Sequence, residues 1–149
     1  VPGTPADAKG LLKAAIRDND PVCVFEGEML YNIKGEVPED PDFIIPLGVA
    51  ELKRVGSDVS IITHGKMIHN ALAAADKLEK EGISADVLDL RSLRPLDVDA
   101  ILATVIKTNR VVLVEEGWSF GGITSTVAAI IQEEAFDHLD APILRVTQA

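Results

Sequence analysis

The sequence is poor in cysteine and in aromatic residues. Of its 149 residues one is a cysteine, Cys23, and 4% are Phe, Trp or Tyr. A single cysteine excludes an intramolecular disulfide and fits a reducing, intracellular compartment. Because Cys23 lies inside the apolar run Pro21–Phe25, we expect a buried, inert thiol rather than a nucleophile. Hydrophobic residues still make up 47% of the chain, so it can form a core, and that core must be aliphatic.

Several functional signatures are also missing. No apolar run approaches the roughly 20 residues that a membrane span needs, and the N-terminus has no secretory-signal pattern. The formal net charge is −10, and an acidic surface repels phosphate backbones, which disfavours nucleic-acid binding. The sequence has no pair of His ligands, cysteine cluster, serine nucleophile elbow or P-loop. We therefore expect neither a nucleic-acid nor a membrane partner.

The middle of the chain repeats an apolar, β-branched run followed by a helical pattern. Val59–Thr63 ends at His64-Gly65, and a stripe from Ile68 to Leu78 predicts the helix that follows it. Further strands are predicted at Ala85–Leu90, Arg110–Glu115 and Pro142–Thr147, and further helices after Asp97 and from Ile123. Repeated β–α units with right-handed crossovers predict an α/β fold, with helices on both faces of a mostly parallel sheet.

The run Val49–Val55 differs because polar and apolar residues alternate in it. This pattern predicts a half-exposed edge strand with Glu51 and Lys53 exposed, whereas Ile61 and Ile62 on the central strand should both be buried. Only two residues separate this run from the next. If the two strands are neighbours, they can therefore pair only as an antiparallel hairpin.

The first 47 residues read as a helix, a strand and a long connection. Thr4 is a good N-cap and Pro5 suits the first helical position, which predicts a helix over Thr4–Arg17 that ends before Pro21. Val22–Phe25 reads as a buried strand. The Gly- and Pro-containing stretch from Glu26 to Leu47 is longer than loops within compact α/β units, so we interpret it as a linker between two domains.

Candidate functional residues lie at the predicted carboxyl ends of the strands, where ligands bind in such sheets. They are His64, Arg91, Glu115 and Glu116. His64 could form an acid–base pair with either glutamate or simply hydrogen-bond to a loop. The two glutamates could hold a cation, yet neighbouring residues on a strand point to opposite faces. Gly117–Gly122 opens a helix as a phosphate site would, but two acids precede it. These residues alone give no convincing catalytic set.

The same stretches carry a family resemblance. Ser92–Asp97 after a buried strand, Val114–Trp118 and Gly121-Gly122 resemble the C-terminal domain of transketolase-like thiamine diphosphate enzymes. More narrowly, the chain resembles the β subunits of pyruvate dehydrogenase components along essentially its whole length. The stretches that carry this narrower resemblance are Pro5–Leu12, Ala15–Pro21, Glu26–Tyr31 and Leu139–Thr147.

The resemblance implies a specific fold and division into domains. It implies a three-layer α/β/α domain with a mostly parallel five-stranded sheet. The first strand runs antiparallel beside the third and the second is central, which excludes the hairpin. Residues 1–27 would be the end of a pyrimidine-binding domain, residues 28–48 a linker, and residues 49–149 most of the C-terminal domain. The apolar stripe of the first helix would then lack its usual cover, so we expect this chain to self-associate.

The resemblance also implies a function for the intact enzyme. It would decarboxylate pyruvate on thiamine diphosphate and acetylate lipoyl groups, and branched-chain 2-oxoacid or acetoin dehydrogenase β subunits are alternatives with the same fold. A non-catalytic α/β binding module is an alternative of another class. The sequence starts after the family's cofactor-activating glutamate, and the other subunit holds the diphosphate and its Mg²⁺. We therefore expect this fragment to be inactive, with no catalytic or cofactor-binding residue.

The implied partners are an α subunit, a second β subunit and a dihydrolipoyl acyltransferase core. The implied location is the cytoplasm in a bacterium or the mitochondrial matrix in a eukaryote. Relatives bind K⁺ at the helix end that matches Ala15, Ile16, Asp18 and Asp20. A helix C-terminus offers carbonyls without partners and a negative partial charge, so K⁺ is a physically reasonable ligand there. An ordinary helix stop is the alternative.

Overall fold

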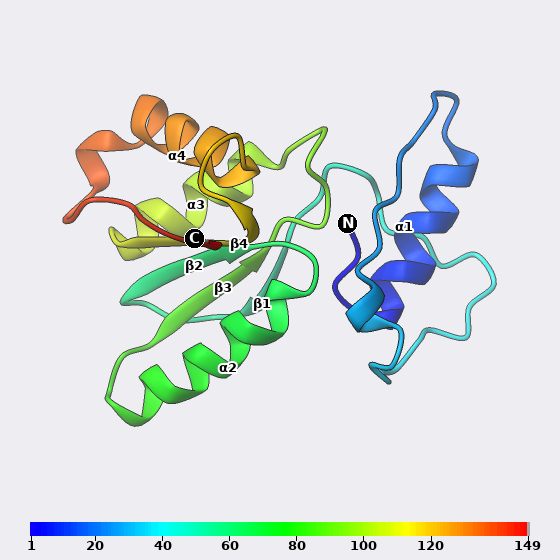
Figure 1. The fold of residues 1–149 in the computed structure, drawn as a ribbon, viewed down its shortest axis with the longest axis horizontal. Helices are drawn as coiled ribbons and strands as arrows, with labels where there is room; N and C mark the ends of the chain where they lie inside the picture. Colours follow the sequence, from blue (N-terminus) through cyan, green and yellow to red (C-terminus); the bar gives the residue numbers. More distant parts are fainter. Residues whose placement is uncertain (149) are drawn as a thin grey trace.

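A five-stranded mixed sheet forms the centre of the molecule in the computed structural model, which describes residues 1–148 (Figure 1). The strand order is β1-β3-β2-β4-β5, with β1 antiparallel to β3 and the other neighbours parallel. The strands are β1 (Glu51–Arg54), β2 (Val59–Thr63), β3 (Ala85–Asp89), β4 (Val111–Trp118) and β5 (Leu144–Gln148). The predicted fold class is confirmed, and β1 and β2 do not form a hairpin.

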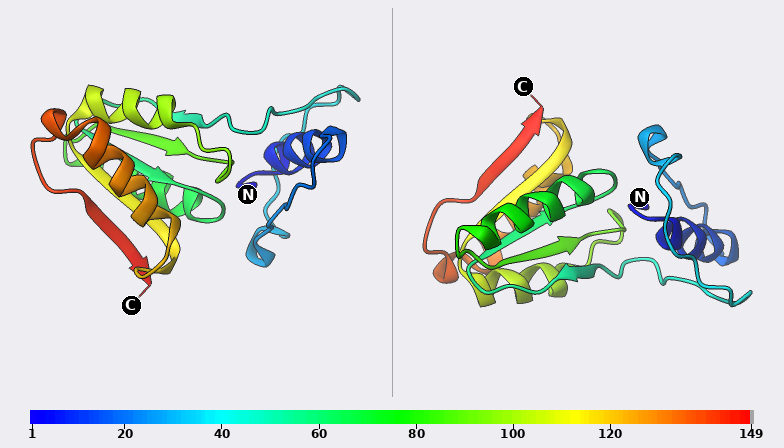
Figure 2. Two further views of the ribbon diagram at one scale, coloured as in Figure 1. Left: turned by 90° about the horizontal axis from the view of Figure 1, so that it is seen from above. Right: turned by 90° about the horizontal axis from the view of Figure 1, so that it is seen from below.

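Helices cover both faces of this sheet, as the two views of Figure 2 show. They are α2 (Met67–Lys80) on one face and α3 (Val98–Thr108) and α4 (Ile123–Glu134) on the other. Ile62 packs in the core beneath α3 and α4, whereas Ile61 packs in the core beneath α2. Their exposed fractions are 1% and 4%, so the predicted burial of both side chains on the central strand is confirmed.

The edge strand β1 departs from its predicted burial. Leu52 is exposed, whereas Glu51 is half-buried and the side chain of Lys53 is only 15% exposed. The prediction that Glu51 and Lys53 are exposed was therefore wrong. The reason is that both side chains pair with charged residues from other elements, which alternation within one strand does not reveal.

Helix boundaries follow the capping residues closely. Thr4 caps α1 (Pro5–Arg17), since its hydroxyl oxygen accepts a hydrogen bond from the Asp7 N–H at 3.1 Å. Asp97 caps α3 by accepting from the Ala100 N–H at 3.0 Å. Gly82 follows α2 with φ of +81°, a left-handed conformation that glycine adopts without strain.

The region before the sheet consists of α1 and a long strap, residues 18–50, that contains the short 3₁₀ helix η1 (Glu28–Leu30). Part of the strap runs back along α1, where the Ile45 N–H donates to the Gly10 carbonyl at 3.1 Å. The ammonium groups of Lys9 and Lys13 donate to strap carbonyls at Pro38 and Pro41. The strap is therefore held against α1 mainly by hydrogen bonds that involve backbone carbonyls.

The predicted strand Val22–Phe25 does not form. No strand of the described residues pairs with it, and the side chain of Phe25 is 67% exposed. Cys23 is exposed as well, so its predicted burial was wrong. An apolar run becomes a buried strand only beside another strand, and residues 1–148 provide none at this place.

No helix of the described residues has the length and apolarity to cross a bilayer.

Candidate functional site

The carboxyl ends of the three central strands meet at one edge of the sheet. We call this edge the strand-end rim and define it by His64, Gly65, Arg91, Glu115 and Glu116. Figure 2 shows the N-terminal end of the chain near the carboxyl end of β3. The place where open α/β sheets usually bind ligands is therefore partly covered by residues 1–7 of the chain itself.

Gly3 lies so close to the rim that only glycine fits without movement. A Cβ atom on Gly3 would be 3.0 Å from the Gly65 carbonyl oxygen and 3.1 Å from Asp89 Oδ2. The Gly3 carbonyl oxygen is 2.9 Å from His69 Nε2 on α2, and Pro2 and Gly3 are both buried. Residues 1–3 thus approach the rim through backbone atoms.

Five charged side chains gather where this segment meets the rim: Asp7, Glu51, Lys53, Asp89 and Arg91. We call them the rim ion cluster. Arg91 Nη1 lies 3.4 Å from Asp7 Oδ1 and 3.0 Å from Glu51 Oε2, while Lys53 Nζ lies 3.4 Å from Asp7 Oδ2. Asp7 is 1% exposed, so its charge depends on these partners. The cluster links α1, β1 and the end of β3.

The backbone of Arg91 has φ of +52°, an unfavourable conformation for a residue with a side chain. The guanidinium is fixed at the same time by two carbonyl oxygens of the chain before β1. Nε donates to Val49 and Nη2 to Ala50, each at 3.2 Å. Arg91 therefore connects the strap and α1 to the sheet through one planar group.

Asp89 is the least compensated member of the rim ion cluster. It is 0% exposed; Oδ1 accepts from the Arg91 N–H at 3.1 Å, and Oδ2 has no hydrogen-bond partner within residues 1–148. Burial is the main cause that raises the pKa of Asp89 to about 7; the nearby carboxylate of Asp7 also raises it, whereas the hydrogen bond from the Arg91 N–H lowers it. The neutral carboxylic acid is therefore favoured below about pH 7.

His64 does not form either of the two arrangements expected from the sequence. Its Nε2 is buried and has no hydrogen-bond partner among the residues that the structure describes. Burial lowers the pKa of His64 below its usual value, although Glu115 and Glu116 act in the opposite direction. The histidine is therefore held neutral, and no bonded acid–base pair forms.

The two neighbouring glutamates point away from each other, as their position on one strand predicts. Glu115 is 4% exposed and accepts hydrogen bonds from the Thr124 hydroxyl and backbone N–H in the first turn of α4. Arg145 Nη2 lies 3.7 Å from Glu115, whereas the exposed Glu116 pairs with Lys66. The side chains diverge, so they do not hold a cation together.

This arrangement also answers the question of a phosphate site at Gly117–Gly122. The carboxylate of Glu115 already lies at the N-terminus of α4, so close to Gly122 that a Cβ there would clash with it. An anion at this helix end would meet a buried negative charge. The described residues of this loop therefore do not fit a diphosphate group, and no cofactor step can be assigned to them.

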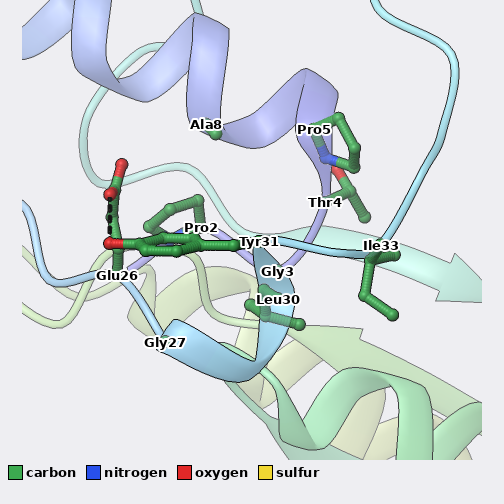
Figure 3. A pocket seen from close by; sticks show the side chains of 10 residues that line it. All are labelled: Pro2, Gly3, Thr4, Pro5, Ala8, Glu26, Gly27, Leu30, Tyr31 and Ile33. Atoms are coloured by element: carbon green, nitrogen blue, oxygen red, sulfur yellow. Dashed lines mark hydrogen bonds between the residues drawn. The ribbon is translucent and has the colours of Figure 1, made fainter.

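A pocket of about 210 Å³ lies between the start of α1 and the strap (Figure 3). Its lining is mainly apolar and includes Pro2, Pro5, Leu30 and the ring of Tyr31, whose hydroxyl donates to Glu26 Oε2 at 3.3 Å. Its other hydroxyl, on Thr4, is engaged in the cap of α1 and donates to Asp7 Oδ2 at 2.6 Å. The pocket can accept an apolar side chain, but its residues do not make a catalytic site.

The residues predicted to bind K⁺ lie at the end of α1. The Ala15 carbonyl accepts a weak hydrogen bond from the Asp18 N–H at 3.4 Å, and Asp18 Oδ1 accepts from the Asp20 N–H at 2.9 Å. Ile16, Asp18 and Asp20 are exposed, and no metal-type cluster of His, Cys, Asp and Glu occurs within residues 1–148. The carbonyl and carboxylate oxygens are present, and the site stays a prediction.

Sequence reasoning missed the roles of Asp7, Lys53 and Asp89. Asp7 and Asp89 were not among the candidate residues, and Lys53 was expected only to be exposed on an edge strand. The available signal was the presence of two acids, Asp86 and Asp89, in the otherwise apolar run of β3. A carboxylate in that place requires a partner or a proton.

Comparisons with known proteins agree with the fold. Residues 48–149 match the family model described as "Transketolase, C-terminal domain". In Bacillus subtilis, the 2-oxoisovalerate dehydrogenase subunit beta is 54% identical and the pyruvate dehydrogenase E1 component subunit beta is 53% identical, each over 98% of this chain and 45% of the relative. The chain thus spans less than half the length of these relatives.

A solved structure is similar too. The structure titled "Split gene transketolase, inactive beta4 tetramer" aligns with a TM-score of 0.64 and 37% identity, over 74% of this chain and 36% of that one. The resemblance inferred from Ser92–Asp97 and the other motifs is confirmed by these matches. The sheet order, the antiparallel β1 and the match over residues 48–149 lead to one conclusion: the chain belongs to the transketolase C-terminal domain family.

Proposed function

We propose that this chain is part of the β subunit of a thiamine-diphosphate-dependent 2-oxoacid dehydrogenase, with pyruvate as the substrate of the intact enzyme. The observation that carries the proposal is the 53–54% identity to two such β subunits over 98% of the chain. The intact enzyme would decarboxylate pyruvate and acetylate lipoyl groups. Because the two relatives act on different acids by name, 2-oxoisovalerate and acetoin dehydrogenase activities are the alternatives.

The part of the subunit described here has an architectural role. Its C-terminal domain, residues 49–149, would pair β subunits and present a surface to a dihydrolipoyl acyltransferase core, while an α subunit completes the enzyme. Residues 1–27 would end the pyrimidine-binding domain and residues 28–48 would be the linker. The different construction of the two regions supports this division, since the described aliphatic core lies almost wholly beyond residue 48.

Cofactors belong to the intact enzyme in this proposal. Thiamine diphosphate and Mg²⁺ would be bound by residues outside this chain, because the helix end that could take a diphosphate is filled by Glu115. K⁺ would be held by the carbonyls of Ala15 and Ile16 and by Asp18 and Asp20. The enzyme would work in the cytoplasm of a bacterium or the matrix of a mitochondrion.

A chimera tests the proposal. Residues 1–149 replace the matching part of the B. subtilis pyruvate dehydrogenase β subunit, which is expressed with its own α subunit. We expect an assembled α/β complex with pyruvate decarboxylase activity, and we expect Ile62→Asp in the same chimera to abolish assembly. A chimera that folds by circular dichroism but does not bind the α subunit would contradict the proposal.

The substrate needs a separate measurement. Activity of the longer protein that contains this chain is compared on pyruvate, 2-oxoisovalerate and acetoin. A higher kcat/KM for pyruvate supports the main proposal, and a preference for either other substrate replaces it with that alternative.

A further inference from the structure

We propose that residues 117–122, which connect the end of β4 to α4, form the surface at which two copies of this chain pair. The inference rests on the proposed pairing of β subunits and names the contact through which they pair. We call residues 117–122 the aromatic loop, because they include Trp118 and Phe120. Figure 2 shows this loop next to the tip of β5, which is the edge strand opposite β1.

The first argument is where the aromatic residues lie. The chain has four Phe, one Trp and one Tyr, and none of them belongs to the two aliphatic cores of the described residues. Trp118 is 64% exposed and Phe120 is 96% exposed, although only one residue separates them. Aromatic side chains are enriched in the buried centres of protein interfaces and carry much of the binding energy there. The aromatic loop therefore has the composition of an interface centre.

The second argument is that the backbone of the loop is fixed while its two aromatic side chains are free. The Ser119 carbonyl oxygen accepts from Arg145 Nη2 at 2.6 Å and from the Ser125 hydroxyl at 3.3 Å. Arg145 Nε donates to Thr124 Oγ1 at 3.1 Å, and the Thr124 hydroxyl donates to the buried Glu115. A loop that is already ordered loses less conformational entropy when it binds a partner.

The third argument is charge, and it identifies the occupant as a second copy. Residues 117–122 contain no ionisable side chain. The two acids before the loop have partners in their own chain, since Glu115 lies 3.7 Å from Arg145 and Glu116 pairs with Lys66. The loop therefore offers no free charge that would attract a basic partner. Two copies with a net charge of −10 each repel one another, and a neutral apolar contact is where they can approach most easily.

The fourth argument is the area that such a contact would bury. A Trp or Phe side chain buries roughly 150–250 Å². Twofold symmetry brings the same loop from both copies into the contact, so Trp118 and Phe120 would remove roughly 500–800 Å² from water. That is about half of the roughly 1,600 Å² of a standard interface. The neighbouring strand β5 exposes Leu144 (62%) and Val146 (54%), which can supply part of the remainder.

The fluorescence of Trp118 tests the proposal directly. Trp118 is the only tryptophan of the chain, so its emission reports on the aromatic loop. Emission, acrylamide quenching and sedimentation are measured on one dilution series of the 149-residue chain. We expect the emission maximum to move to shorter wavelength and quenching to fall as dimers form. Association through α1 would leave Trp118 in water, so dimers with unchanged emission, or a monomer at every concentration, would overturn the proposal.

A pair of variants identifies the residues responsible. Phe120→Ser should raise the dimer dissociation constant, taken from the midpoint of the Trp118 emission change, by at least about tenfold. Phe136→Ser is the matched control, since Phe136 is 61% exposed on the 3₁₀ helix η2 (Phe136–His138), and it should change the constant by no more than about twofold. Circular dichroism checks that both variants fold. Equal effects of the two substitutions would contradict a contact centred on the aromatic loop.

The longer protein that contains this chain gives the last measurement. Phe120→Ser should lower the number of β chains in each complex with the α subunit while leaving the binding of α intact. The chimera that tests the proposed function measures binding of α and decarboxylation, so one proposal can fail without the other. A shift of Trp118 emission that requires the α subunit would assign the loop to that partner and overturn pairing with a second copy.

Discussion

The two regions of the chain are stabilised in different ways. Residues 49–148 contain two aliphatic cores, one on each face of the sheet, built around side chains such as Ile62 and Ile68. Among the buried aliphatic side chains, residues 1–48 contribute Leu11 and Ile45. Residues 49–148 are stabilised by burial of apolar surface. Residues 1–48 are positioned by ion pairs, hydrogen bonds to carbonyls and close glycine contacts. Interactions of the second kind are weaker and more sensitive to pH and salt.

The exposed apolar side chains show the same contrast. Ile16 is 74% exposed and Leu12 is 42% exposed. Both lie on α1, whose apolar stripe was predicted to need a covering surface. Phe25 and Met29 on the strap are 67% and 72% exposed. Surface of this kind on a region with little core indicates a missing partner, either another part of a subunit or a second copy of this chain.

The largest expected effect tests the core of the sheet. Ile62→Ala should lower the free energy of unfolding by about 2–5 kcal/mol, because it leaves a cavity beneath α3 and α4. Leu12→Ala is the control in the other region and should cost less than about 1 kcal/mol. Urea denaturation of both variants provides the measurement. Equal losses would contradict the contrast between the two regions.

Two glycine substitutions, with smaller expected losses of stability, compare the same two regions. A Cβ on Gly56 would clash with the backbone of Ala85, so Gly56→Ala should destabilise the sheet by roughly 1–3 kcal/mol. In Gly10→Ala the Cβ meets Ile45 Cγ1 at 2.5 Å, the side chain of a strap residue that can move. The gain of about 1 kcal/mol in helix propensity offsets part of that cost. Thermal unfolding of the pair should therefore show a larger loss for Gly56→Ala, and the reverse order would count against a movable strap.

Self-association is the next prediction. The exposed stripe of α1 should make the isolated chain dimerise or oligomerise as its concentration rises, and Ile16→Asp should weaken the association by about tenfold, as loss of buried Ile surface implies. Lys80→Gln, at the far end of α2, changes the net charge by the same −1 and serves as the control for charge. Sedimentation across a concentration series decides the matter. A monomer at the highest concentration would mean that α1 needs no partner.

The smallest effect concerns the ion pair between Arg17 and Asp42, which holds the strap to α1 at 3.0 Å. Both side chains are exposed, 48% and 81%, so Arg17→Ala should change the unfolding free energy by less than about 0.5 kcal/mol. Instead, the strap should open more often, and hydrogen exchange of the amides in residues 36–45 should report this as faster exchange. Adding 1 M salt to the wild type should produce a similar increase.

The sequence predicted the sheet better than the region before it. Runs such as Val59–Thr63 can be recognised because the central strands are buried on both faces and the helices show their periodicity. The position of β1 required the family resemblance, since the spacing between Arg54 and Val59 alone suggested a hairpin. Pairing partners in a sheet are a long-range property that local patterns do not contain.

The errors have a common physical cause. Val22–Phe25 has the composition of a strand but no neighbour, and Lys53 has the composition of a surface residue but a buried carboxylate beside it. In both cases the outcome depends on what lies across an interface. The same holds for the rim: the sequence identified His64, Arg91 and Glu115 as strand-end residues, but not that Gly3 would lie against Gly65 and Asp89 at this edge.

The order of the strands has a consequence for how the chain assembles. β1 pairs with β3 and not with the strand that follows it, so this edge of the sheet cannot close until β3 has been synthesised. A nascent chain leaving the ribosome therefore has β1 available long before its pairing partner is synthesised. Until then its amides must bond to water, and its free edge can pair with other chains. The shortest strand of the sheet is the one exposed to this wait, which limits the edge available for misassembly.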